Sequence, residues 1–172
     1  MNSESRPLPP GQIHIVYTCF GGTHSSSVAA AIHLGKLPRD RLPTPQELLA
    51  TPRFDTVHPK HRGQLAFAGL DKDGHRVYVL GRGGLSADAV RSLLETACLL
   101  IGGRPARVLV CDTLPCVNFC MRIGGWLSRE AGLVGIGRPI VTWGTLRAYP
   151  RIVRLVREVE EQVRRLTRPG RG

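Results

Sequence analysis

The stretch IHIVYTCFGGTHSSSVAAAIHLG, residues 13–35, decides the fold. It begins with β-branched and aromatic residues typical of a buried strand, turns at Gly21 and Gly22, and continues into segment 28–32, whose alanines favour a helix. Glycines permit a tight turn and expose backbone N–H groups, and the first turn of a helix carries unpaired N–H donors. A strand, a glycine turn and a helix in this order predict an α/β fold with a site for a phosphate or carboxylate.

Reactive and hydrogen-bonding side chains crowd into this turn. A turn of this kind can serve simply to cap the helix, but here Cys19 and His24 flank the glycines and hydroxyl groups follow them. We expect the anion to bind at Gly21, Gly22, Thr23, Ser25 and Ser26. Gly22→Val is then expected to abolish binding while the fold persists.

Known phosphate-binding motifs do not match the turn. A Walker A loop requires G-x-x-x-x-G-K-[ST], and no lysine follows these glycines. The thiol phosphatase pattern C-x5-R-[ST] fits Cys19, but Ser25 stands where the arginine would be. Serine cannot replace the bidentate grip of arginine on phosphate. His24 would partly compensate by favouring the thiolate of Cys19, so Cys19 and His24 remain candidate catalytic residues.

Alternating patterns predict the remaining elements. We expect strands at 65–70, 77–80, 107–111 and 139–143, and helices at 45–49, 87–100 and 117–129. The first two strands form a hairpin that turns at Asp73-Gly74. The whole pattern predicts a three-layer α/β sandwich with a mostly parallel sheet of about five strands, an antiparallel hairpin and a C-terminal amphipathic helix.

Three further candidates follow a predicted strand at 107–111. In open α/β sheets ligands bind at the carboxyl ends of the strands, where Asp112, Thr113 and Asn118 would lie. Asp112 could orient a base or hold a magnesium-bound water, or it could cap the next helix. Thr113 and Asn118 could bind the ligand or serve in a turn. Segment 57–62 is basic and could clamp an anion at the glycine turn, but we prefer the interpretation that it is a solvated surface loop.

The chain is strongly basic, and most of its charge is arginine. Its formal net charge is +11, and all but Lys36, Lys60 and Lys72 of its 24 basic residues are arginine. In the C-terminal part, apolar residues recur with helical spacing and arginines fill the other face, with Pro150 suited to the first turn. The low aromatic content of 5% gives no platform on which the successive bases of a single-stranded nucleic acid could stack. We therefore expect any nucleic-acid binding to be weak and not sequence-specific.

Composition predicts a single domain. We expect a flexible arm at 1–11, one α/β domain at 12–167 and a basic tail at 168–172. No segment reaches the length of a membrane span, and the N-terminus lacks the pattern of a signal peptide, which predicts a cytoplasmic protein. The five cysteines lie on apolar segments, so we interpret them as small buried hydrophobes and expect no metal site.

The chain resembles a known family in an ordered set of strings. These are YTCFGGTHSSSVAAAIHLGKLP at 17–38, FD at 54–55, GLD at 69–71 with VYVLG at 77–81, VCDTLP at 110–115 with Asn118, IGGWLS at 123–128 and GRPIV at 137–141. The set resembles an uncharacterised bacterial family, domain of unknown function 3189. Phe20 stands where that family is expected to have tyrosine. The resemblance implies no mechanism and does not explain the basic C-terminus.

Three functions fit these residues. The first is binding of a phosphate- or nucleotide-type anion, with phosphoryl or nucleotide handling as its purpose. The second is a noncatalytic module that senses a metabolite in the same pocket. The third is a thiol enzyme with Cys19 as nucleophile, and for it Cys19, His24 and Asp112 are the catalytic candidates. The partner in each case is a small anionic ligand, and the sequence names no cofactor.

Overall fold

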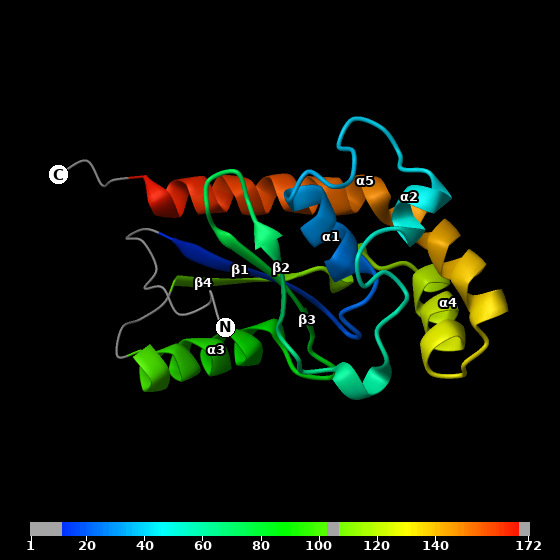
Figure 1. Cartoon of the computed structure of the whole chain (residues 1–172), viewed down its shortest axis with the longest axis horizontal. Coiled ribbons are helices and arrows are strands. Elements are labelled where there is room, and N and C mark those ends of the chain that lie inside the picture. Colours follow the sequence, from blue (N-terminus) through cyan, green and yellow to red (C-terminus); the bar gives the residue numbers. More distant parts are fainter. Residues whose placement is uncertain (1–11, 103–106, 169–172) are drawn as a thin grey trace, which may run out of the picture.

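Four strands form one sheet at the centre of the structure, a computed structural model that describes residues 12–102 and 107–168 (Figure 1). The strands are β1 (Ile13–Cys19), β2 (Ala66–Leu70), β3 (Arg76–Gly81) and β4 (Arg107–Asp112). Their order in the sheet is β2-β3-β1-β4. β1 pairs in parallel with β3 and β4, and β2 runs antiparallel to β3. The predicted mostly parallel sheet with one antiparallel hairpin is confirmed.

β1 occupies the interior of the sheet because its side chains suit burial on both faces. Ile15 and Tyr17 point into the larger core, whereas Val16 points to the opposite face. Cys19 at the end of β1 pairs with Gly81 at the end of β3, and Thr18 pairs with Asp112 at the end of β4. The loops that follow all three parallel strands therefore leave the same edge of the sheet.

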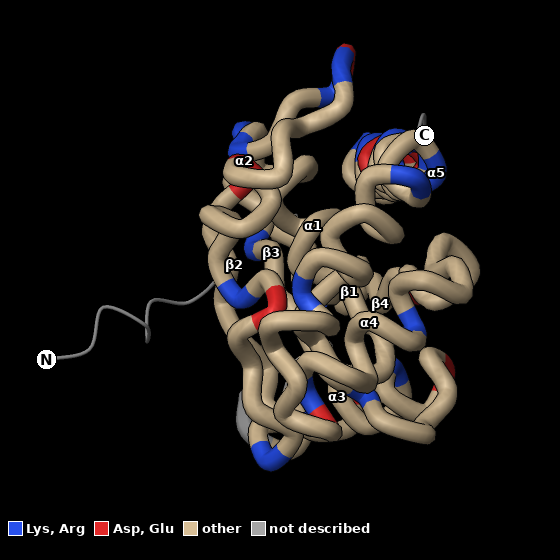
Figure 2. Tube along the Cα trace, turned by 90° about the vertical axis from the view of Figure 1, so that its right-hand side faces the viewer, with Lys and Arg blue, Asp and Glu red and all other residues tan. Residues whose placement is uncertain are grey.

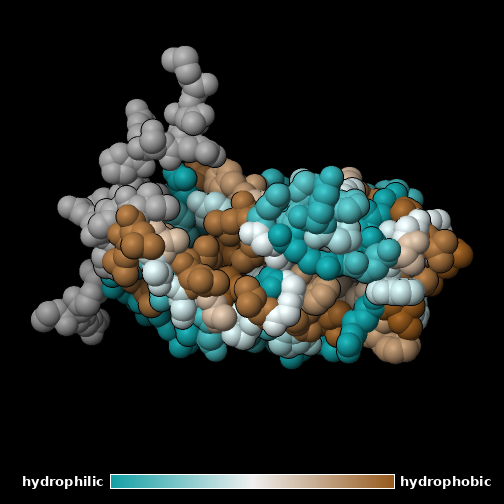
Figure 3. All heavy atoms as spheres, turned by 90° about the horizontal axis from the view of Figure 1, so that it is seen from below, coloured by the Kyte–Doolittle hydropathy of each residue, from teal (hydrophilic) through white to brown (hydrophobic). Residues whose placement is uncertain are grey.

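Helices cover both faces of the sheet, as the predicted three-layer arrangement requires. α1 (Ser25–His33) and α5 (Val134–Thr167) cover the face that carries Tyr17, and α3 (Ala87–Gly102) covers the other (Figure 1). The second cover is incomplete, because α3 packs mainly against β4. Phe67 in β2 stays 52% exposed, and hydrophobic surface is visible on this side of the molecule (Figure 3).

Short elements surround the edge where the parallel strands end. They are α2 (Pro45–Leu49), two 3-10 turns, η1 (Pro59–His61) and η2 (Leu114–Cys116), and α4 (Phe119–Arg129). α2 begins at a capping box between Thr44 and Glu47, and it has the bounds that the sequence predicts. The helix predicted at 117–129 is α4, which starts two residues later.

The strand predicted at 139–143 is wrong, and the sheet has four strands rather than about five. These residues belong to α5, which contains both Pro139 and Pro150 in its interior, so Pro150 does not mark a first turn. Apolar and β-branched residues gave the segment a strand-like pattern, but packing against α4 decides its structure. A Cβ atom on Gly137 would lie 2.4 Å from the Ser128 backbone nitrogen, which shows how closely the two helices approach.

The sequence also predicts features at the two ends of the chain. The arm expected at 1–11 and all but the first residue of the tail expected at 168–172 lie outside the described residues. Two of the cysteines, Cys111 and Cys116, lie in the main core among aliphatic side chains, as expected for small buried hydrophobes.

Candidate functional site

The two glycines after β1 have different structural roles. Gly22 has a φ of +69°, and a Cβ atom there would lie 2.5 Å from the Gly81 backbone nitrogen, so the turn packs directly against the end of β3. A Cβ atom on Gly21 would meet only the Thr23 methyl group, at 3.6 Å. The expectation that Gly22→Val leaves the fold intact is therefore wrong, because the valine side chain has no room beside β3.

The hydroxyl groups after the turn are used inside the protein. Ser25 Oγ lies 2.8 Å from Thr113 Oγ1, and Thr113 Oγ1 donates to the Thr18 carbonyl at 2.9 Å. Since the Thr113 proton is committed to Thr18, Ser25 is the donor to Thr113. Thr23 Oγ1 donates to the Arg53 carbonyl at 2.6 Å. These side chains fix the loop in place, and the groups they leave for a ligand are backbone N–H donors.

Those donors lie at the start of α1. His24 is the N-cap residue, but its side chain makes no capping hydrogen bond. In the part of the chain that the structure describes, the backbone N–H groups of Ser25, Ser26 and Ser27 have no acceptor. The positive end of a nine-residue helix therefore opens beside the glycine turn without a side-chain cap.

Cys19 lies under the turn and contacts its backbone. The Gly22 N–H donates to Cys19 Sγ at 3.1 Å, and Ser26 Oγ lies 3.0 Å from the same sulfur. Cys19 is only 5% exposed, but it forms part of the wall of the adjacent cavity. Among the described residues no hydrogen bond joins His24 to Cys19, so any effect of His24 on the Cys19 thiol would have to act without direct contact.

Asp55 holds His24 and connects the long 36–62 segment to the helices. Its fully buried carboxylate accepts hydrogen bonds from His24 Nε2 at 3.1 Å, Ser128 Oγ at 2.7 Å and Arg138 Nε at 2.9 Å, and Arg129 Nε lies 3.1 Å away. Burial alone would raise the pKa of Asp55, but the hydrogen bonds from His24, Arg138 and Ser128 outweigh it and lower the pKa to about 2. Asp55 therefore stays ionised at neutral pH.

A cavity of about 640 Å³ opens over the turn. It lies between the loop after β1, the 57–62 segment, η2 and α4, at the edge where the parallel strands end. Its wall contains five of the predicted site residues: Cys19, Gly21, Thr23, His24 and Ser25. Val57, Pro59 and Arg62 close one side, so the basic segment does lie where a clamp over the turn would lie.

The other predicted site residues lie beneath or beside the cavity. Asp112 accepts a hydrogen bond from Arg82 at 3.0 Å and another from the Leu114 N–H, which makes it a cap and an ion-pair partner. Asn118 caps α4 through the Met121 N–H and donates to the Gly144 carbonyl at 2.7 Å, so both ends of its amide are occupied. Gly22, Ser26 and Thr113 support the loop from within.

Three arginines line the cavity. Only Arg62 lies in the segment that the sequence predicts as a possible clamp. Arg62 pairs with Glu130 and lies over the Phe20 ring at 4.7 Å, and Arg129 contacts Asp55. The side chain of Arg122 has no hydrogen bond or ion pair in the described parts of the chain. Figure 2 looks onto this end of the molecule and shows basic positions on several of its segments.

α4 supplies a stripe of cavity residues that the sequence could have revealed. Arg122, Trp126 and Arg129 are spaced at i, i+4 and i+7, so they share one face of the helix, and Gly125 on that face packs against the His24 ring. The sequence pattern that could have identified these residues is the helical spacing of two cations and an aromatic residue. Its orientation toward the glycine turn depends on tertiary packing.

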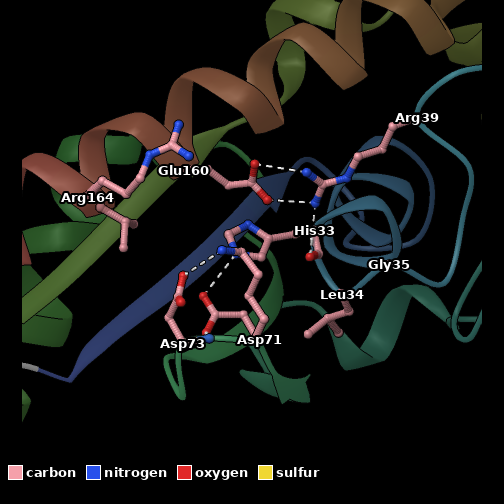
Figure 4. A pocket seen from close by; sticks show the side chains of 10 residues that line it. His33, Leu34, Gly35, Arg39, Asp71, Asp73, Glu160 and Arg164 are labelled. Carbon is pink, nitrogen blue, oxygen red and sulfur yellow. Dashed lines mark hydrogen bonds and ion pairs between the residues drawn. The ribbon is translucent and has the colours of Figure 1, made fainter.

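A second cavity, of about 290 Å³, lies near the other end of β1, at the C-terminus of α1 (Figure 4). His33 is held there between Tyr17 Oη at 2.7 Å and Asp71 Oδ2 at 3.2 Å. Arg39 makes two hydrogen bonds to Glu160, at 2.6 and 2.9 Å. These pairs satisfy one another, so His33 is structural here.

Comparison with known proteins gives one match. The family model described as "Protein of unknown function (DUF3189)" matches residues 14–161, which include the glycine turn, the 57–62 segment, α4 and most of α5. No curated protein and no solved structure matches the chain. In the described residues, no helix is long and apolar enough to cross a membrane, and no three histidine, cysteine or acidic side chains gather as metal ligands would.

Proposed function

The chain belongs to DUF3189, a family whose function is unknown, and we propose that it binds a small phosphate-bearing molecule in the cavity over its glycine turn. The phosphate lies at the start of α1, between the turn and α4. The observation that carries this proposal is that residues of an uncapped helix N-terminus and three arginines line one cavity.

Each part of the arrangement suits an oxyanion. Backbone N–H groups and the helix dipole favour negative charge without requiring a nearby cation. Arginine adds paired donors that match the geometry of phosphate oxygens. Arg62 and Arg129 already have acidic partners, whereas Arg122 has none among the described residues, so Arg122 is the cation that an incoming anion would pair with.

A thermal-shift titration with inorganic phosphate, sulfate and organic phosphates tests binding. A ligand at about 100 times its Kd adds about 2.7 kcal/mol of stability, which corresponds to roughly 5 to 10 °C in Tm for a chain of this size. Arg122→Gln is expected to weaken affinity about tenfold or more, because it removes a charged hydrogen bond.

The matched control is Arg154→Gln, at an exposed arginine of α5 that does not line the cavity. It should bind phosphate like the parent protein. If none of these anions raises the Tm of the parent protein, the proposal is wrong. An equal loss of affinity in the two variants would show that the overall charge, rather than the cavity, attracts the anion.

A thiol enzyme is the second candidate function, and the position of Cys19 favours it. Cys19 is a residue of the cavity wall, and its sulfur accepts a hydrogen bond from the Gly22 N–H, so a nucleophilic atom lies beside the proposed anion site. The arginine that the loop lacks at Ser25 could come instead from α4. In such a reaction the thiolate attacks phosphorus, the bond to the leaving oxygen breaks and that oxygen takes a proton. Water then hydrolyses the phosphocysteine to phosphate and free thiol.

Cys19→Ser distinguishes an enzyme from a binding or sensing module. For a thiol enzyme, phosphate release from p-nitrophenyl phosphate falls to the buffer rate in the variant while phosphate affinity is kept, since serine is nearly isosteric. We expect affinity to be retained in either case. A parent protein that binds phosphate but releases none from this substrate would favour the sensing module.

A further inference from the structure

Building on the proposed phosphate site, we infer that the ligand is a nucleoside monophosphate whose base stacks on Trp126. The cavity is large, its wall has both polar and apolar parts, and its two aromatic side chains differ in what covers them.

The cavity is too large for a phosphate alone. Its volume of about 640 Å³ falls within the range typical of sites for organic ligands of several hundred daltons. The phosphate donors that we assign in it are the backbone N–H of Ser25 at the start of α1 and the side chain of Arg122 on α4. The remaining volume is left for an organic group attached to the phosphate.

The apolar parts of the wall suit a flat organic group. They consist of aliphatic side chains and proline from three segments: Val57, Pro59, Leu114, Val117 and Met121. Trp126 stands next to them, 59% exposed. Because it lies one turn of α4 from both Arg122 and Arg129, a ring on the indole can be connected to a phosphate held by the same helix.

The two aromatic residues of the cavity differ in what already covers them. The ring of Phe20 carries the Arg62 guanidinium at 4.7 Å. In the described residues, Trp126 has no aromatic or cationic partner. An exposed indole at the rim of a cationic cavity is the arrangement on which bases stack, and one stacked base is worth roughly ten- to a hundredfold in affinity.

The charges favour a monophosphate. Only Arg122 of the three lining arginines lacks a partner in the described chain, and Glu130, the acidic residue of the wall, already pairs with Arg62. One free guanidinium and one helix N-terminus match the charge of a single phosphate group. A triphosphate would bring several more charges to the same cavity.

The two tryptophans of the chain allow a direct test. Trp143 lies on α5 under the Arg147 guanidinium at 4.8 Å and does not line the cavity. In Trp143→Phe, all indole fluorescence comes from Trp126. We expect AMP and GMP to quench it saturably, and ribose 5-phosphate and inorganic phosphate to leave it unchanged. In Trp126→Phe, the same nucleotides should leave the Trp143 emission unchanged.

Affinities measured by calorimetry complete the test. Trp126→Ala should weaken AMP binding ten- to a hundredfold and leave phosphate binding within about twofold, whereas Trp143→Ala should change neither. Phosphate binding with no nucleotide preference, or equal affinity of both variants for AMP, would overturn the inference while leaving the proposed function intact. Phenyl phosphate binding as well as AMP would assign the site to aryl phosphates instead. Failure of every phosphate compound to bind the parent protein would overturn both proposals.

Discussion

Two buried side chains, Asp55 and His33, hold segments that lie far apart in the sequence. Asp55 joins the loop before η1 to α4 and α5, and both Arg53 and Asp55 adopt positive φ angles of 69° and 49° to place it there. His33 joins β1 to the hairpin turn through Tyr17 and Asp71. Neither role is readable from sequence, because each depends on contacts across dozens of residues.

His33 should make the stability of the protein depend on pH. Burial lowers the pKa of His33 more than its contact with Asp71 raises it, so the unfolded chain binds a proton first. The free energy of unfolding is then expected to be highest above about pH 6.5 and to fall as the pH decreases below that value. His14, whose pKa burial also lowers, contributes to the same trend.

Urea unfolding of the parent protein and of His33→Gln at pH 7.5 and 5.0 measures this dependence. The parent should lose stability between these two values, and His33→Gln should lose less. His58→Gln, at an exposed histidine, is the control and should behave like the parent. A variant at position 33 with the full pH dependence of the parent would contradict the assignment.

At the scale of elements, the contact between α4 and α5 positions one wall of the cavity. It is close because glycines face the partner helix: a Cβ atom on Gly124 would lie 2.4 Å from the Val141 nitrogen, and one on Gly137 2.4 Å from the Ser128 nitrogen. Side chains at these points would push α4 away from α5 and move Arg122 and Trp126 with it.

Gly137→Ala is therefore expected to lower the free energy of unfolding by about 3 kcal/mol, because the new methyl group meets backbone atoms that cannot move aside cheaply. Gly135→Ala, two residues earlier in the same helix, has no atom within 4 Å of its new Cβ. It should raise stability by about 0.5 to 1 kcal/mol through helix propensity. Urea denaturation of the two variants measures both changes in the free energy of unfolding. Equal changes would show that α4 and α5 can move apart without loss of stability.

The elements that the sequence predicts correctly have patterns that local residues determine. The run of β-branched and aromatic residues in β1, the turn at Asp73-Gly74 and the capping box at Thr44 each depend on neighbours only. The prediction of a strand at 139–143 failed because the apolar residues there suit either a strand or a buried helix, and contact with α4 selects the helix. Short apolar runs carry no period that separates the two.

At the scale of the whole molecule, the layers and the edge of the sheet at which the glycine turn lies could be predicted, but the side chains that α4 brings to that edge could not. Loops after parallel strands meet at one edge, so the turn at 20–24 was expected there. The orientation of Arg122 and Trp126 toward this turn could not be predicted, because it depends on how α4 packs against α5, about 100 residues later in the chain. Weak, salt-sensitive binding of nucleic acid to the net charge of +11 stays a prediction.

The contact between Gly22 and Gly81 also limits how the lineage of this protein can change. A Cβ atom at either position would strike the backbone of the opposite turn, at 2.5 and 2.7 Å, rather than a side chain. A substitution at one glycine therefore cannot be compensated by trimming the other, as paired changes in a core often are. Each step away from glycine is blocked separately, so the two positions should change rarely, even in descendants that exchange the ligand of the neighbouring cavity.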